Sequence, residues 1–172
     1  VYTYASNDSI DVGLGADEVD GGIGTDGLAK DFGSAAAAIG FDLYANTFSG
    51  PGAYANLEYF IDLKTGGGND TVDTGTANSD ALGDDTIDTR GGDDVVTVRN
   101  GQDTVDLGAG NDRLVIDWRG ASFSNNTFMT LSGTAGGYSG SLAGTQSNAP
   151  AVTFANVESF TIHTLVSGGN GT

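Results

Sequence analysis

Aspartate residues recur at nine-residue intervals in two separate runs of this chain. The first run contains Asp8, Asp17 and Asp26, and the second contains Asp85, Asp94, Asp103 and Asp112. An aliphatic residue stands two positions after each of them, namely Ile10, Val19, Leu28, Ile87, Val96, Val105 and Leu114. Glycine stands two positions before every one except Asp8. A carboxylate, a flexible turn and an aliphatic side chain in constant phase therefore define one repeating unit of turn and short strand.

Nine-residue frames divide the chain into blocks and spacers. We expect a first block at 1–29, a β-rich spacer at 30–64, a second block at 65–117, a β-rich spacer at 118–166 and the start of a third block at 167–172. The second block opens on a frame around Asp70, and an insertion of about six residues near 74–79 separates it from the next frame. An Asn-x-Glu-x-Phe segment, starting at Asn56 or Asn156, leads into each later block. Because the repeats reach both ends, we expect the chain to be a piece of a longer protein.

Composition excludes several classes of partner. Asp and Glu number 23 against 6 Lys and Arg, which gives a formal charge of −17. Nucleic acid and anionic membrane surfaces require basic protein surfaces, so neither is expected as a partner. The chain has no apolar stretch long enough for direct membrane insertion. It has no cysteine, so disulfides and thiolate metal sites are excluded. Self-repulsion of this size opposes a compact state unless cations neutralise it.

The repeating unit predicts an all-β fold. The first six residues of a frame are rich in glycine and turn sharply, and the last three form a short strand whose aliphatic side chain points inward. Two frames then make one coil of 18 residues, and stacked coils form two parallel sheets with the aliphatic residues between them. Alternating apolar and polar runs in the spacers predict short antiparallel strands.

The turns of such a fold gather aspartates and unpaired backbone carbonyls along two edges. Like charges at this spacing repel one another, and a hard cation relieves the repulsion. Calcium accepts six to eight oxygen ligands in flexible geometry, whereas magnesium requires a stricter octahedron. Zinc and copper prefer His or Cys, and the chain has one His and no Cys. Calcium is therefore the predicted metal.

The frames resemble the G-G-x-G-x-D-x-U-x nonapeptides of RTX (hemolysin-type) calcium-binding proteins. Residues 21–29 match every fixed position, and 65–73 and 89–97 each lack only the first glycine. Frame 98–106 departs from the pattern at Arg99 and Asn100, and frame 3–11 departs at Tyr4 and Ser6. The resemblance implies a right-handed parallel β-roll, with several calcium ions lying between turns of frames two apart. Asp85 is then expected to stack on Asp103, Asp94 on Asp112 and Asp8 on Asp26, while Asp70 has two possible neighbours.

The same resemblance implies the metal-binding residues. The carboxylate ligands are expected to be Asp8, Asp17, Asp26, Asp70, Asp85, Asp94, Asp103 and Asp112. Turn geometry and carbonyl oxygens are expected from Gly22, Gly24, Gly66, Gly68, Gly92, Gly108 and Gly110. The aspartates at the ninth position of each frame are expected to face solvent. Glu58 and Glu158 are expected to have a structural role at the entrance of a block.

These features predict a calcium-binding structural module and no catalytic residues. The resemblance implies export by type I secretion, folding on calcium outside the cell, and a place in a large bacterial adhesin, toxin or surface-layer protein. Expected partners are calcium ions, other domains of the same long chain and cell-surface glycans. The alternative is a non-catalytic module of a secreted protease, lipase or polysaccharide epimerase, although neither H-E-x-x-H nor G-x-S-x-G occurs in this chain. The aromatic residues have two possible roles, stacking on carbohydrate or capping the ends of the roll. We favour capping.

Overall fold

The computed structural model describes residues 1–75, 83–119, 127–134, 136–144 and 149–164. These residues form strands β1 to β16 and no helix. In particular, no helix among the described residues is long and apolar enough to cross a membrane. The expected third block at 167–172 lies outside the described residues, as does most of the expected insertion.

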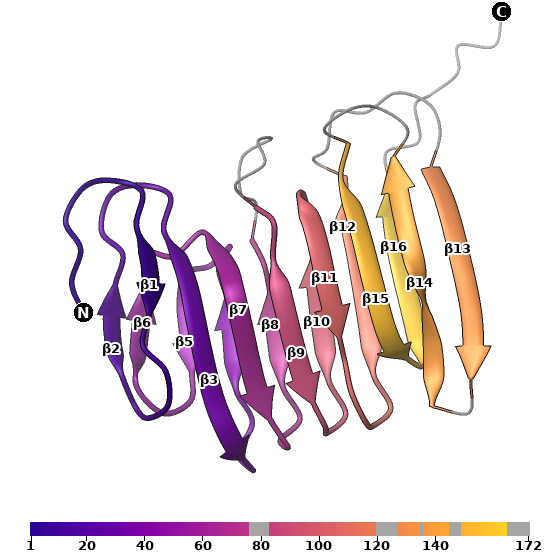
Figure 1. Cartoon of the computed structure of the whole chain (residues 1–172), viewed down its shortest axis with the longest axis horizontal. Helices are drawn as coiled ribbons and strands as arrows, with labels where there is room; N and C mark the ends of the chain where they lie inside the picture. Colours follow the sequence, from indigo (N-terminus) through magenta and orange to yellow (C-terminus); the bar gives the residue numbers. More distant parts are fainter. Residues whose placement is uncertain (76–82, 120–126, 135, 145–148, 165–172) are drawn as a thin grey trace, which may run out of the picture.

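Two large sheets and one small sheet make up the fold. The eight-stranded sheet has the order β1 (Ser9–Asp11), β3 (Gly27–Ala35), β7 (Tyr59–Gly66), β9 (Thr86–Arg90), β11 (Gln102–Asp106), β15 (Ala151–Val157), β14 (Gly137–Gly144) and β13 (Thr127–Thr134). The six-stranded sheet has the order β16 (Ser159–Thr164), β12 (Arg113–Trp118), β10 (Val95–Val98), β8 (Thr71–Asp73), β4 (Gly40–Asp42) and β5 (Thr47–Ser49). Strands β2 (Glu18–Asp20) and β6 (Ala53–Ala55) form a pair of their own. Figure 1 shows the coils stacked along the long axis of the molecule.

Strand register confirms the coil length. β1 pairs with β3, β9 with β11 and β10 with β12, all in parallel, and Val95 opposite Arg113 shows the spacing of 18 residues. β8 pairs with β10 so that Thr71 lies opposite Val95, which is a spacing of 24. The pair β7 and β9 has the same longer spacing, with Leu63 opposite Ile87. The longer coil therefore contains the six extra residues that the sequence predicts, and the parallel β-roll is confirmed.

The segments between the repeat blocks belong to the same roll. β4 and β7 pair in parallel with β8 and β9, and β15 and β16 pair in parallel with β11 and β12. Antiparallel pairing occurs between β4 and β5 and among β13, β14 and β15. The expected antiparallel strands are thus present, and parallel strands from the same segments join the two blocks into continuous sheets. The division of the chain into blocks and spacers stays a prediction.

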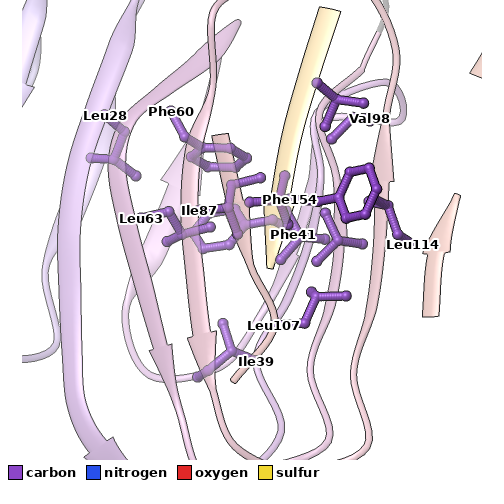
Figure 2. Packing of buried hydrophobic residues seen from close by; sticks show 14 of the residues in the cluster. Leu28, Ile39, Phe41, Phe60, Leu63, Ile87, Val98, Leu107, Leu114 and Phe154 are labelled. Atoms are coloured by element: carbon purple, nitrogen blue, oxygen red, sulfur yellow. The ribbon is translucent and has the colours of Figure 1, made fainter. Parts of the chain in front are cut away.

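The core lies between the sheets, as the inward aliphatic positions require. All seven aliphatic residues of the repeat are buried: Ile10, Val19, Leu28, Ile87, Val96, Val105 and Leu114. Figure 2 shows side chains of this core, among them Phe60 and Phe154, packed between the strands. Near β3 to β7 the core is aromatic, and the rings of Phe41 and Phe60 meet edge to face with centroids 5.2 Å apart. Phe128, by contrast, is exposed on the edge strand β13.

Candidate metal centre

The sixth-position aspartates stack into two rows, one along each edge of the roll. In the first row, the backbone N–H of Asp8 donates to Oδ1 of Asp26 at 2.8 Å. In the second row, Asp70 donates in the same way to Asp94 at 2.7 Å, and Asp94 donates to Asp112 at 2.8 Å. The expected neighbours are therefore confirmed as stacked turns, and the neighbour of Asp70 that the sequence left open is Asp94.

Six aspartates accept such a bond from one coil earlier, and we call them the ladder aspartates. They are Asp26, Asp70, Asp85, Asp94, Asp103 and Asp112, with donors at Asp8, Ile39, Phe60, Asp70, Asp85 and Asp94. All six are buried. One bond to each Oδ1 fixes the direction of the carboxylate, because the donor N–H belongs to the backbone of the neighbouring coil.

The second oxygen of most ladder aspartates has no partner. Among the described residues, Oδ2 is buried without a hydrogen bond in Asp26, Asp70, Asp94, Asp103 and Asp112. A buried ionised oxygen without a partner is costly, so a site of this kind requires a proton or a cation. These five oxygens are divided between the two rows, and each is a buried position that attracts positive charge.

Burial perturbs the acidity of these groups. It raises the pKa of the Asp112 carboxyl to about 6, and the nearby Asp94 charge adds to the effect. Burial also raises the pKa of Asp70 and of Asp94. For Asp85 and Asp103, burial holds the pKa well above the ordinary value, and in Asp103 the neighbouring Asp85 charge adds to it. Burial of these five carboxylates therefore disfavours their ionised form unless a cation is bound.

The turn glycines bring backbone carbonyls into the same edges. A Cβ built on Gly92 would lie 2.1 Å from the carbonyl oxygen of Gly68, and one on Gly110 would lie 1.7 Å from that of Gly92. The other expected turn glycines lie against a backbone carbonyl of an earlier coil in the same way: Gly22, Gly24, Gly66, Gly68 and Gly108. These positions therefore leave room only for glycine, and the Cβ built on Gly110 would also lie 3.0 Å from Oδ1 of Asp112, so a carbonyl oxygen and a ladder carboxylate lie in the same turn.

This donor set fits calcium. Among the residues that the structure describes, no group of three or more Asp, Glu, His or Cys side chains converges to hold a metal ion. A metal here would therefore take one or two carboxylates and complete its shell with backbone carbonyls. Calcium accepts that mixture readily, whereas zinc does not.

Two expected ligands lie outside the ladder. Asp8 is half-buried, and the hydroxyl of Ser6, which stands where the repeat has glycine, donates to its Oδ2 at 3.2 Å. Oδ2 of Asp17 lies 2.7 Å from Nζ of Lys30. The structure thus brings six of the eight expected aspartates into stacked, buried turns and gives the other two different surroundings.

The ninth-position aspartates have a role that the sequence did not predict. Oδ1 of Asp20 accepts the backbone N–H of Gly22 at 3.1 Å, and Oδ1 of Asp106 accepts that of Gly108 at 3.1 Å. The same bond, reaching two residues ahead, occurs at Asp11, Asp73 and Asp88. These side chains close the turn locally, as in an Asx turn. The in-phase Asp-x-Gly spacing, which all of these aspartates except Asp88 share, was the signal that could have revealed this role.

The Asn-x-Glu segments close the last turn of each block. Oε2 of Glu58 accepts the N–H of Asp26 at 2.7 Å, and Oε2 of Glu158 accepts the N–H of Asp112 at 2.8 Å. Glutamate therefore takes the place that the next ladder aspartate would occupy. Burial raises the pKa of Glu58, as it does for ladder aspartates. The structural role expected for these two glutamates is this contact.

The asparagines of these segments hold the ninth-position aspartates. Nδ2 of Asn56 donates to Oδ1 of Asp20 at 2.7 Å, and Nδ2 of Asn156 donates to Oδ1 of Asp106 at 2.7 Å. Both asparagines have a positive φ, 53° and 55°, which asparagine tolerates better than most residues. Each Asn-x-Glu turn thus contacts both aspartates of the turn before it. The repetition of the motif was the sequence signal for this contact.

Comparison with models of known protein families agrees with this geometry. The RTX calcium-binding nonapeptide repeat matches in four copies, over residues 1–28, 63–79 and 81–114. Those ranges contain all six ladder aspartates. A search of curated proteins finds no match. The stacked aspartate turns and the repeat match lead to one conclusion: this chain carries RTX calcium-binding nonapeptide repeats, which form a structural calcium-binding module.

Proposed function

We propose that this chain is a calcium-dependent structural module that folds after secretion, when calcium binds along both edges of the roll. The observation that carries the proposal is the set of buried Oδ2 atoms without partners along the two edges, in Asp26, Asp70, Asp94, Asp103 and Asp112. Calcium would supply the positive charge that these carboxylates lack. With the metal bound, the ladder aspartates can all be ionised inside the folded chain.

The ligands would come from the ladder and from the turns stacked on it. We propose carboxylate ligands at Asp26, Asp70, Asp85, Asp94, Asp103 and Asp112, with carbonyls from the glycine turns. Gly68, Gly92 and Gly110, which follow one another along one edge, would line a continuous set of sites. Asp8 would contribute to a weaker site, because it is half-buried and Ser6 replaces its glycine.

Calcium binding and folding are coupled in this proposal. In the unfolded chain the stacked turns do not exist, so metal-binding free energy becomes folding free energy. The formal charge of −17 adds repulsion that the ions relieve. Cells keep internal calcium scarce, and secreted chains meet far more of it. Such a module would therefore stay unfolded during export and fold outside the cell.

RTX proteins are typically exported by type I secretion, and we propose that route here. We place the module in an adhesin, toxin or surface-layer type of protein at or beyond the bacterial surface. The continuous roll supports this assignment, because coils stacked along one axis can be extended by further coils to make a long module (Figure 1). The module itself would hold other domains in place and perform no catalysis.

Far-UV circular dichroism during a calcium titration, with magnesium as the comparison ion, tests the proposal. We expect a cooperative gain of β-structure with calcium and none at the same concentration of magnesium. The variant D94A/D112A should need more calcium, because it removes two ladder carboxylates. Its matched control is D84A/D93A, which makes the same charge change at exposed positions. An unchanged titration of D94A/D112A, or equal folding by magnesium, would refute the assignment.

A further inference from the structure

A buried lysine occupies one turn of the roll. Lys30 lies on β3 with a fully buried side chain. Its Nζ donates to the carbonyl oxygens of Gly13 at 2.7 Å and Gly15 at 2.8 Å, and to Oδ2 of Asp17 at 2.7 Å. An ammonium has three N–H donors, so these three oxygens satisfy it completely. The ring of Phe32 lies 5.0 Å from the same nitrogen, which adds a cation–π contact.

The three oxygens belong to the repeat. Gly13, Gly15 and Asp17 hold the second, fourth and sixth positions of frame 12–20. In the following frame the same positions are Gly22, Gly24 and Asp26, and there Oδ2 of the aspartate has no hydrogen-bond partner. In the Asp17 turn, Lys30 supplies the positive charge.

Strand pairing explains why the Asp17 turn differs from the ladder. The strand after Asp17, β2, pairs with β6 and stays outside the six-stranded sheet. The turn stacked on Asp17 is the one before β6, where the N–H of Ala53 donates to the carbonyl oxygen of Asp17 at 2.8 Å. That turn reads Gly50-Pro51-Gly52 and contains no carboxylate. The oxygen atoms available to a cation therefore come mainly from one turn. Such a set suits an ammonium with three N–H groups better than a metal ion that needs six to eight oxygen ligands.

We propose that the Asp17 turn holds the Lys30 ammonium as its resident cation and binds no calcium. This inference replaces the expectation that Asp17 is a calcium ligand. It rests on the proposed function only where it contrasts the Asp17 turn with the ladder aspartates, which are proposed to bind calcium. The consequence is a roll in which the turn between β1 and β2 carries its own cation, while the ladder turns take their cations from solution.

Amine labelling tests the inference directly, because the chain has two lysines, Lys30 and Lys64. The side chain of Lys64 is 31% exposed and that of Lys30 is 0% exposed, so Lys64 is an internal control. In the calcium-loaded protein, brief acetylation should modify Lys64 and spare Lys30, and added calcium should not change this. Labelling of Lys30 that rises as calcium is increased beyond the folding midpoint would mean that calcium displaces the ammonium, and the inference would be wrong.

Ion counting by native mass spectrometry gives a second, independent result. Asp17→Asn should leave the number of bound calcium ions unchanged, whereas Asp94→Asn should lower it. A lower count in Asp17→Asn would overturn the inference. Lys30→Met should lower the melting temperature at saturating calcium more than Lys64→Met does, and equal melting temperatures would contradict a resident ammonium. A wild-type protein without bound calcium would refute the proposed function, and the labelling of Lys30 would still decide the present inference.

Discussion

Acid should replace calcium in stabilising this roll, within a limited pH range. Burial raises the pKa of Asp112 in the folded chain from 3.8 to about 6. A carboxyl whose pKa rises on folding contributes stability that is fully present below its unfolded pKa and is lost as pH rises through the folded value. In calcium-depleted buffer, stability should therefore fall as pH increases from about 4 to about 7. Burial raises the pKa of Asp70 and Asp94 in the same direction.

The size of the effect follows from the shift. A change of about two pKa units corresponds to about 3 kcal/mol for Asp112. The side chain itself is inaccessible, but Asn111 and Arg113 beside it are exposed, so water screens the charge and about 1–2 kcal/mol should remain. Asp117 does not offset this, because the Arg119 guanidinium lowers its pKa to about 2 and it stays ionised over the whole range.

Urea unfolding in calcium-depleted buffer measures the prediction, with an osmolyte at fixed concentration to keep the chain folded. Asp112→Asn keeps an oxygen for the N–H of Asp94 and cannot ionise. It should be more stable than the wild type near neutral pH without calcium, and less stable with calcium. The control is Asp93→Asn, an exposed site that accepts the N–H of Asn111 at 2.9 Å. Identical behaviour of the two variants, or wild-type stability that rises with pH over this range, would refute the reasoning.

Three further substitutions test the packing of the roll in saturating calcium. Gly110→Ala should lower the free energy of unfolding by about 2 kcal/mol or more, because its Cβ would overlap a backbone carbonyl, whereas Gly67→Ala, with its nearest contact at 3.9 Å, should change little. Val96→Asp should abolish the β-signal in circular dichroism, because it buries a charge between the sheets, and the exposed Thr104→Asp should not. Glu158→Ala should reduce the free energy of unfolding in urea by about 1–3 kcal/mol, because the N–H of Asp112 loses its acceptor. Glu158→Gln keeps an acceptor and should retain most of the stability. Equal losses in the two variants would contradict a role for this hydrogen bond.

The repeating part of the fold could be predicted because its geometry is local. A strand alternates its side chains with a period of two, so the position of Val96 in its frame fixes which way it points. The coil length and the extra residues in the second block follow from the spacing of the aspartates. The register of β10 against β12 confirms the first, and that of β8 against β10 confirms the second. The buried ladder aspartates follow from the same spacing.

Contacts between distant segments could not be predicted in the same way. The N–H of Asp26 meets Glu58, and the N–H of Asp112 meets Glu158, across 32 and 46 residues. Only the pairing of strands from the intervening segments brings them together. Asp17 shows the same limit, because its frame resembles the others and its surroundings differ only through the turn stacked on it and through Lys30.

The distribution of positive charge explains why this roll should respond to calcium. Among the described residues, the ion pairs of Arg90, Arg99 and Arg119 involve Asp31, Asp73 and Asp117. Lys30 pairs with Asp17 and Lys64 with Asp62. In that part of the chain, no ion pair reaches a ladder aspartate. Five of the six Lys and Arg side chains thus pair with aspartates outside the ladder, and the ladder carboxylates have no charge compensation from such pairs. Because burial weakens screening by dissolved salt, a cation bound inside the turns is the remaining way to ionise them in the folded state.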